Sequence, residues 1–294
     1  MPSCSNIILF FICMHFNTLV PASAKSSVVG CNITNSLQQG EKYNIKTGAF
    51  CSNLKEIISV SSTLTFEDFI RILKHYLHHN SYRVRFQHIN RFQYGWNRGN
   101  ENLAYTMLKW SVINLQPPPN DLWLEFGVAG GYSINLTAVL RQSTLPVYGF
   151  DSFFGLPEEW NSLYRKGYFS QRGVAPPTEK NVILIPGLFN KTLVPFLNRH
   201  TGEKAGFINI DMDLYDGAIF VLRNLKPFMQ KGTIIHFHDL TSMDVRVRFL
   251  GNPSDIDQET LALFHFLKES EDITLQLMPF YSFGYRQAVV FRVL

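Results

Sequence analysis

Two aspartates separated by one residue, Asp211 and Asp213, are the residues of this sequence whose types and spacing most directly suggest chemistry. They follow the apolar run 207–210, which has the composition of a buried strand. Because side chains alternate along a strand, both carboxylates are expected to point the same way. Two like charges held together are unfavourable unless a cation, a proton or a functional role compensates them. The pair predicts a site that binds a cation or removes a proton; the alternative is that both carboxylates only hydrogen-bond to turns.

A second group of residues has the pattern of a nucleoside-binding turn. Residues 122–126 are typical of a strand, Gly127 and Gly131 lie in the turn that follows, and a helix is expected over 132–141. Glycines let a ligand approach the backbone, and a helix N-terminus offers unpaired N–H groups. Asp151 ends the next strand, at the interval expected for an acid that binds ribose hydroxyls. The pattern suits a dinucleotide or S-adenosylmethionine, and a tight turn without a ligand is the alternative.

The elements that must position these side chains alternate along the second part of the chain. Strands are expected at residues 122–126, 147–150, 182–185, 207–210, 233–237, 273–277 and 287–293. Helices are expected at residues 132–141, 192–198, 217–229 and 258–268. This alternation predicts an α/β fold with a mostly parallel seven-stranded sheet and helices on both faces. No helix fits between the last two strands, so they are expected to form a C-terminal antiparallel hairpin at one edge of the sheet.

One motif makes the sequence recognisable. The run YGFDSFFGLPEEW at residues 148–160 resembles the FDSFEGLPE signature of the macrocin O-methyltransferase-like family, and LEFGV at 124–128 belongs to the same resemblance. Further matches are Gly187-Leu188-Phe189 with Thr192-Leu193, Asp211-Met212-Asp213-Leu214-Tyr215 and Gly232-Thr233-Ile234-Ile235. The resemblance covers about residues 121–294. It implies a Rossmann-like class I methyltransferase fold with S-adenosylmethionine as the cofactor.

The resemblance also implies which residues bind that cofactor. The methionine side would contact Glu125, Gly127 and Gly131, the ribose Asp151, and the adenine Ser152 and Phe153. The positions of these residues agree with this assignment, since the carboxyl ends of adjacent parallel strands meet at one edge of a sheet.

The metal site of the family is altered in this chain. Antibiotic-tailoring members bind magnesium beside a sugar hydroxyl, through the aspartate motif and further acids after the next strand. Here the usual acidic pair after that strand is replaced by His238 and Asp239. Oxygen ligands suit Mg²⁺, whereas a histidine favours a softer divalent ion. Asp211, His238 and Asp239 are therefore candidate ligands for Mg²⁺ or another divalent ion, and a site without a metal is the alternative.

The function implied by the resemblance is O-methylation of a small hydroxylated acceptor such as a sugar or glycoside. The acceptor hydroxyl must lose a proton, for which Asp213 is the candidate base and His238 an alternative, because the ordinary pKa of histidine lies near neutrality. Two other functions stay open: a secreted, catalytically silent binding module on the same fold, and a dinucleotide-dependent oxidoreductase. The oxidoreductase is less favoured because Glu125 stands where a dinucleotide fingerprint has its first glycine.

Composition fits one large domain with an N-terminal appendage. The 294 residues are 46% hydrophobic and carry a formal charge of +4, which is too small to suggest a nucleic-acid partner. The expected organisation is a signal peptide at 1–24, an extension of loops and helices at 25–118 and a methyltransferase domain at 119–294. Within the extension, helical spacing is found over 54–79 and 100–115.

The first residues predict entry into the secretory pathway. Residues 7–16 are almost wholly apolar, and Ala22-Ser23-Ala24 is a small-x-small cleavage pattern. The apolar run is shorter than the about 20 residues of a membrane span, so no stable span is expected after cleavage; a signal anchor is the alternative. The mature protein would be secreted or retained in the endoplasmic reticulum lumen. After cleavage Cys31 and Cys51 would remain, either joined by a disulfide or free. N-glycosylation sequons begin at Asn32, Asn135 and Asn190, and Asn32 is the best-placed glycan acceptor. Nothing in the sequence indicates the oligomeric state.

Overall fold

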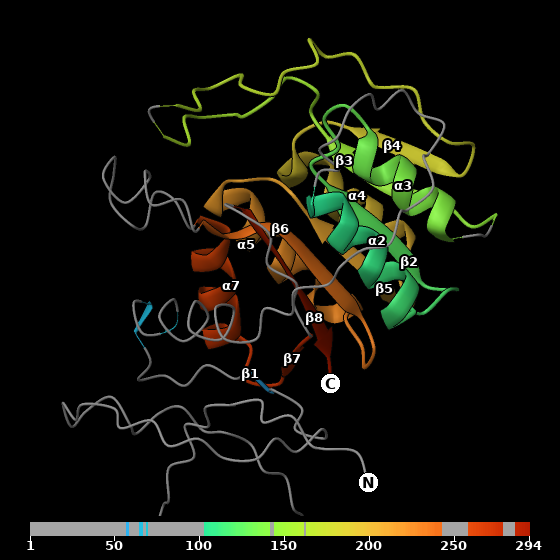
Figure 1. Cartoon of the computed structure of the whole chain (residues 1–294), viewed down its shortest axis with the longest axis vertical. Coiled ribbons are helices and arrows are strands. Elements are labelled where there is room, and N and C mark those ends of the chain that lie inside the picture. The colour runs from blue at the N-terminus through green and yellow to red at the C-terminus, as the bar shows by residue number, and fades with distance from the viewer. Residues whose placement is uncertain are drawn as a thin grey trace, which may run out of the picture.

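The structure is a computed structural model of the chain, shown in Figure 1. It describes residues 57–58, 65–66, 69, 103–141, 144–161, 163–242, 258–278 and 286–294. The predicted signal peptide, both cysteines of the extension and the Asn32 sequon lie outside these residues. Within the described part, no helix is both long and apolar enough to cross a membrane.

The centre of the molecule is an eight-stranded sheet with the order β1-β7-β8-β6-β5-β2-β3-β4. The strands are β1 (Ile57–Ile58), β2 (Leu122–Phe126), β3 (Val147–Asp151), β4 (Val182–Pro186), β5 (Ala205–Ile210), β6 (Ile234–Ser242), β7 (Leu275–Leu277) and β8 (Arg286–Val293). The strands from β4 to β6 are parallel, and β8 pairs antiparallel with both β6 and β7. This is the predicted Rossmann-like class I methyltransferase fold, with its C-terminal strands antiparallel.

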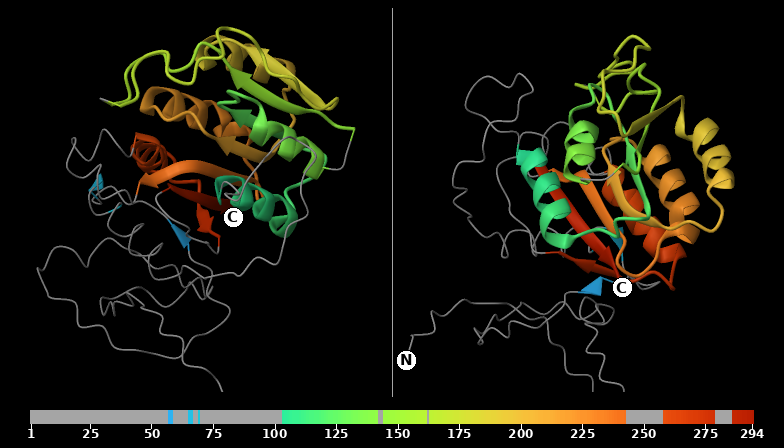
Figure 2. Two further views of the ribbon diagram at one scale, coloured as in Figure 1. Left: turned by 45° about the horizontal axis from the view of Figure 1, so that its top comes forward. Right: turned by 90° about the vertical axis from the view of Figure 1, so that its right-hand side faces the viewer.

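Helices cover both faces of the sheet, as the right-hand view of Figure 2 shows. On one face lie α2 (Leu103–Leu115) and α3 (Tyr132–Arg141). The other face carries α4 (Phe189–Arg199), α5 (Tyr215–Leu225), followed by the short 3-10 helix η2 (Lys226–Phe228), and α7 (Gln258–Glu269). Because both faces are covered, the central strands β2 and β5 are buried along their whole length instead of alternating between buried and exposed residues.

The core lies where β2 and β5 pair in the middle of the sheet. Every residue of these two strands is buried. Phe126 of β2 stacks on Phe150 of β3 at 4.8 Å between ring centroids, and Phe196 of α4 meets Phe150 edge-on at 5.1 Å. Each fully buried side chain of this size contributes about 1.5–3 kcal/mol through the removal of apolar surface from water. The core therefore fixes the carboxyl ends of β2, β3 and β5, where the polar motifs begin.

The extension adds one strand that the sequence pattern did not predict. Ile57 and Ile58 were expected in a helix, but they form β1 and pair antiparallel with Leu275 and Gln276 of β7. Further along, Phe66 and Phe69 pack on Phe264 of α7, at 5.6 and 5.4 Å between ring centroids. The exposed edge of β7 offers backbone partners that outweigh local helical spacing for two β-branched residues. The predicted boundary between the extension (25–118) and the methyltransferase domain (119–294) stays a prediction.

Candidate functional site

A cleft of about 830 Å³ opens at the carboxyl ends of β2, β3 and β5. The chain runs outward from β2 through β3 to β4 and then returns to place β5 on the other side of β2, so the cleft lies at a switch point of the sheet. Ligands of open α/β sheets bind at such points, and the volume lies in the range of cofactor and small-molecule sites. Among the sequence-predicted residues, the lining includes Gly127, Asp151, Ser152, Asp211 and Asp213.

The two predicted glycines are needed for close packing around this cleft. Gly127 has φ of +90°, and a Cβ atom there would lie 1.8 Å from the carbonyl oxygen of Asp211. Gly131 has φ of +81°, and a Cβ atom there would lie 2.9 Å from the ring of Pro176. A side chain at Gly127 would thus push apart the ends of β2 and β5. Gly127 itself lines the cleft, whereas Gly131 is not among the lining residues.

Asp151 closes the glycine turn with its own carboxylate. Its Oδ2 accepts hydrogen bonds from the backbone N–H of Val128 at 2.9 Å and of Ala129 at 2.7 Å, and its Oδ1 accepts one from Phe153 at 2.7 Å. A carboxylate has about four acceptor positions, so capacity remains for a hydroxyl in the cleft. Asp151 lines the cleft, as the ribose assignment requires.

The two residues after Asp151 lie differently. Ser152 lines the cleft, and its Oγ accepts a hydrogen bond from the N–H of Phe154 at 3.1 Å. The side chain of Phe153 is 1% exposed and is not among the lining residues. Contact of Phe153 with an adenine stays a prediction that this buried position does not favour.

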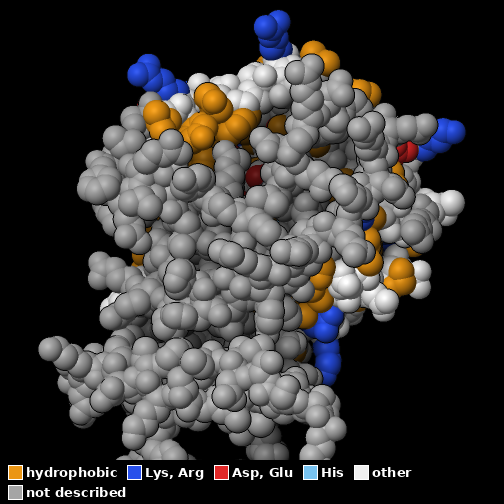
Figure 3. Space-filling model, in the orientation of Figure 1, with side chains coloured by type: hydrophobic (Ala, Val, Ile, Leu, Met, Phe, Trp, Pro, Cys, Tyr) orange, Lys and Arg blue, Asp and Glu red, His pale blue; other side chains and the backbone are white. Residues whose placement is uncertain are grey.

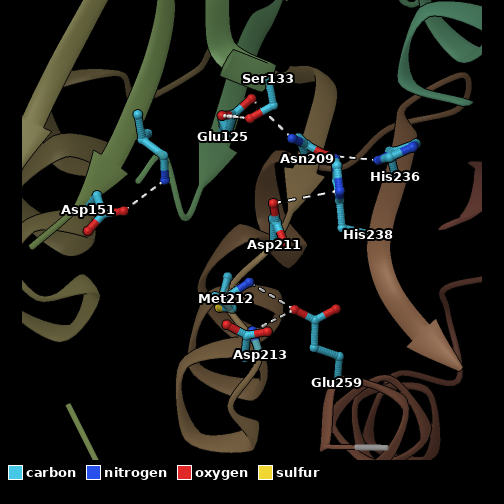
Figure 4. Close-up of polar contacts among 11 residues, drawn as sticks. Glu125, Ser133, Asp151, Asn209, Asp211, Met212, Asp213, His236, His238 and Glu259 are labelled. Carbon is cyan, nitrogen blue, oxygen red and sulfur yellow. Dashed lines mark hydrogen bonds and ion pairs between the residues drawn. The ribbon is translucent and has the colours of Figure 1, made fainter. Parts of the chain in front are cut away.

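Glu125 is the centre of a buried polar network, drawn in Figure 4. Ser133 Oγ donates to Glu125 Oε1 at 2.6 Å, and Asn209 Nδ2 donates to Glu125 Oε2 at 3.0 Å. The Asn209 oxygen faces Nδ1 of His236 at 2.8 Å, and since that oxygen can only accept, the imidazole donates. Burial raises the pKa of Glu125 to about 8, while burial and the nearby His238 lower that of His236. Glu125 is 1% exposed and is not among the lining residues of the cleft, so its predicted contact with the methionine side of the cofactor stays a prediction.

The aspartate motif lies in a loop and not in a strand. β5 ends at Ile210, and Asp213 has φ of +65°, so the alternation expected for Asp211 and Asp213 was wrong. The Asp211 carboxylate is directed toward His238, whereas Asp213 lies at the other end of the loop beside Glu259 (Figure 4). Glu259 of α7, which is 1% exposed, accepts the N–H groups of Met212 at 2.9 Å and of Asp213 at 3.0 Å. The loop is therefore anchored through its backbone, and both aspartates line the cleft.

The comparison with protein families agrees with this geometry. Residues 124–240 match the family described as a methyltransferase domain, and this range contains the glycine turn, Asp151 and the loop after β5. The chain contains a methyltransferase domain. Its Rossmann-like class I fold is that of S-adenosylmethionine-dependent methyltransferases, and the chain is an enzyme of this class.

Several solved structures are similar to this chain at low identity. CalS11, a calicheamicin methyltransferase, has 22% identity and a TM-score of 0.47, with 65% of this chain and 77% of that chain covered. The O-methyltransferase NovP has 20% identity and a TM-score of 0.45, with 64% and 77% covered. The O-methyltransferase TomG from Streptomyces achromogenes has 16% identity and a TM-score of 0.42, with 66% and 81% covered. Among curated proteins, none matches the sequence significantly.

The histidine motif of the methyltransferase domain lies deeper than its aspartates. Nδ1 of His238 is 3.6 Å from Oδ2 of Asp211, and the His238 side chain is 7% exposed. Its ring lies 5.0 Å from that of His236, between centroids. His238 is not among the lining residues of the cleft, and the side chain of Asp239 lies outside the described part of the structure.

The described residues do not form a metal centre. Among them, no three histidine, cysteine, aspartate or glutamate side chains converge in a way that could hold a metal ion. Asp211 and His238 form a pair, but Asp213 lies at the far end of the loop. The candidate set Asp211, His238 and Asp239 is thus brought together only in part, and the two members that the structure describes do not by themselves fit a bound divalent ion.

Three residues that support the site were not predicted from the sequence. In the sequence, Glu259 is an ordinary acid in the first turn of α7. Ser133 and Asn209 are ordinary polar residues within a helix and a strand. Asn209 was the most visible of the three, because an amide within a fully buried strand needs partners. Its contacts with Glu125 and His236 depend on the register of β2, β5 and β6, which only the fold supplies.

Proposed function

We propose that this methyltransferase transfers the methyl group of S-adenosylmethionine to a hydroxyl of a small acceptor such as a sugar or glycoside, as in the macrocin O-methyltransferase-like family. The observation that carries the proposal is a shared cleft in which Asp151, at the end of β3, and Asp213, after β5, both line the wall. In this proposal Asp151 binds the ribose of the cofactor and Asp213 takes the proton of the acceptor hydroxyl. The signature at residues 148–160 forms the β3 end of the same cleft and supports the family assignment.

The residues present fit the cofactor. The glycine turn leads into the N-terminus of α3, Asp151 retains acceptor capacity toward the cleft, and the volume of about 830 Å³ is ample for a nucleoside together with a small acceptor. When bound, S-adenosylmethionine supplies its methyl group from a positively charged sulfonium. The chain's own work is to hold the acceptor hydroxyl in line and to take its proton.

Asp213 is the better-placed base of the two candidates. Asp213 lines the cleft, and the Glu259 carboxylate fixes its backbone. His238 is buried beside Asp211 and does not line the cleft, so an acceptor proton would have to reach it through another group. A base must lie within hydrogen-bond reach of the proton that it removes, so the geometry favours Asp213. His238 then serves to orient Asp211.

Calorimetry of the mature chain with S-adenosylhomocysteine tests the proposal. We expect binding without added metal and no binding of NAD⁺, which separates this function from that of a dinucleotide-dependent oxidoreductase. Repeating the titration and a transfer assay with Mg²⁺ and with a chelator tests the divalent ion that the family pattern suggests. Absence of S-adenosylhomocysteine binding in every condition would contradict the proposed function. Binding without transfer to any hydroxylated acceptor would favour the silent binding module.

We also propose that the protein acts in the secretory pathway, on the basis of the apolar run and the Ala22-Ser23-Ala24 pattern. Expression in a secretory host should yield a chain that begins at Lys25 and carries a glycan at Asn32. N-terminal sequencing and glycosidase treatment measure both. An intact, unmodified Met1 on a cytosolic protein would overturn this proposal and leave the enzymatic one untouched.

A further inference from the structure

The order of the strands indicates where along the cleft the adenine of the cofactor lies. The strands β5, β2, β3 and β4 are neighbours in this order, so the loop of Asp213, the glycine turn and Asp151 follow one another along the cleft. In the proposed function the methyl group faces Asp213 and the ribose binds Asp151. Since the ribose of S-adenosylmethionine stands between its sulfur and its adenine, the adenine is expected beyond Asp151, on the side of β4.

The residues expected to contact the adenine supply only a part of this end of the cleft. Ser152 lines the cleft, but the side chain of Phe153 is buried. From the end of β4, Leu188 lines the cleft with a side chain that is exposed at the surface. Proteins bind a nucleobase through apolar or aromatic side chains on its faces and hydrogen bonds at its edge. Further residues are therefore expected at this end.

The segment between β3 and β4, residues 152–181, forms a wall of this end of the cleft and is here named the arm. Figure 1 shows it projecting beyond the sheet, in yellow-green. The N–H of Leu156 donates to the carbonyl of Tyr168 at 3.0 Å, and the N–H of Gln171 donates to the carbonyl of Phe153 at 3.0 Å. These bonds hold the later part of the arm beside the end of β3, where the adenine is expected.

Phe169 gives the arm an aromatic surface in the cleft. Its side chain lines the cleft and is 40% exposed. Tyr164 stacks on its ring at 5.8 Å between centroids, and Tyr168 meets the ring edge-on at 4.7 Å. These two neighbours hold the ring in place, and its exposed surface is available to a ligand. Figure 3 shows apolar side chains gathered over this part of the surface. Aromatic side chains bind nucleobases by stacking, because every base has a π-face.

Gln171 adds a hydrogen-bond acceptor beside this ring. It is partly buried and lines the cleft. Its Nε2 donates to the carbonyl of Phe169 at 3.2 Å, which fixes the orientation of the amide, because a carbonyl oxygen can only accept. Gln171 therefore offers its Oε1 as an acceptor to a ligand in the cleft. The exocyclic amine of adenine is a donor, whereas a base such as guanine has an acceptor oxygen at the same position.

From this placement we propose that Phe169 and Gln171 form the adenine end of the cofactor site: Phe169 stacks on the ring, and Gln171 accepts a hydrogen bond from the exocyclic amine. The proposal rests on the proposed function and adds two cofactor-binding residues to it. The arm then provides the aromatic contact that was expected from Phe153. Gln171 makes the site selective for adenine over a base with an oxygen in place of the amine.

A pair of ligands that differ only at this position tests the role of Gln171. Calorimetry on the full chain compares S-adenosylhomocysteine with S-inosylhomocysteine, in which an oxygen replaces the amine. We expect the wild-type chain to bind the inosine analogue about tenfold more weakly or worse, because an acceptor then faces an acceptor. Gln171→Ala should reduce this ratio to about threefold or less. The ratio is measured on one preparation, so it does not depend on the fraction of folded protein.

Two further variants separate this effect from general changes. Gln116→Ala, the same change at an exposed position outside the cleft, should leave the ratio unaltered. Phe169→Ala should weaken the binding of both ligands by about fivefold or more and to the same extent, because stacking does not depend on the amine. Phe154→Ala, in the same arm but outside the lining, is its matched control and should bind both ligands as the wild type does.

Each other result contradicts the inference. If the wild-type chain binds both ligands equally, or if Gln171→Ala retains the wild-type ratio, Gln171 does not read the amine. If Phe169→Ala binds S-adenosylhomocysteine as the wild type does, Phe169 does not stack on the adenine. In these cases the proposed function stands, because the wild-type chain still binds S-adenosylhomocysteine. If the wild-type chain does not bind it, the proposed function fails and the inference fails with it.

Discussion

The ends of β3 and β5 each carry aspartates into the same cleft, but the protein holds them in opposite ways. At β3 the functional side chain is itself tied, since the carboxylate of Asp151 accepts three backbone N–H groups. At β5 the backbone is tied, because Glu259 of another helix accepts the N–H groups of Met212 and Asp213. A group that must present a fixed hydrogen-bonding surface to a cofactor benefits from the first arrangement. A group that must exchange a proton benefits from the second, in which an outside residue supplies the rigidity.

The largest expected effect follows from removing the charge of Asp213. Asp213→Asn keeps the shape of the side chain but removes its basicity, so methyl transfer should fall by about 100-fold or more. The dissociation constant of S-adenosylhomocysteine should change by less than about threefold, because Asp151 and the glycine turn are intact. Transfer kinetics and calorimetry measure the two quantities. Asp272→Asn, the same change at an exposed position outside the cleft, is the matched control. If Asp213→Asn transfers methyl groups at the wild-type rate, Asp213 is not the base and His238 becomes the candidate.

The converse change at β3 should act on cofactor binding. Asp151→Ala removes the predicted ribose acceptor and frees three backbone N–H groups, so binding of S-adenosylhomocysteine should weaken by about 1–3 kcal/mol. Asp151→Asn keeps one oxygen acceptor and should lose less. Both are measured by calorimetry on the folded variants. An unchanged dissociation constant in Asp151→Ala would show that this residue does not hold the cofactor.

Glu259 tests whether the second arrangement depends on an outside anchor. Glu259→Ala leaves two N–H groups of the loop without their acceptor in a buried position, so the free energy of unfolding should fall by about 1–3 kcal/mol. Transfer should fall as well, because Asp213 loses its fixed position. Glu259→Gln retains an oxygen acceptor and should be affected less in both measurements. Urea unfolding and transfer kinetics distinguish this from a purely structural role, in which stability alone would change.

A further prediction concerns the pH dependence of stability. Burial raises the pKa of Glu125 to about 8 in the folded chain from an ordinary value of 4.5, so the folded state holds a proton that the unfolded state releases. The contribution of Glu125 to the free energy of unfolding should therefore be largest below pH 4.5. It should decline between pH 4.5 and 8, by up to about 1.4 kcal/mol per pH unit. Glu125→Gln should flatten that slope in urea unfolding from pH 5 to 8. An identical slope in the variant would show that Glu125 is ionised in the fold.

The same contrast separates what the sequence could predict from what it could not. The seven strands from 122 onward and the glycine turn follow from local composition, because buried parallel strands are short apolar runs and the turn needs glycine. The position of Asp151 at a strand end follows in the same way. The loop at Asp213 did not follow, because its positive φ and its anchor depend on α7, 46 residues further on. β1 was missed for a similar reason, since its partner β7 lies more than 200 residues away in the sequence.

The sheet order also has a consequence for synthesis. β8, the last of the described strands to be synthesised, fills the position between β6 and β7. At a translation rate of roughly 5–20 residues per second, the edge of β6 waits about 3–10 seconds between the appearance of Ser242 and that of Val293. During that interval the backbone of β6, at Ile234, Ile235 and Phe237, is an unpaired strand edge of the kind that other chains can join. Covering that edge during those seconds is therefore expected to raise the yield of the folded enzyme.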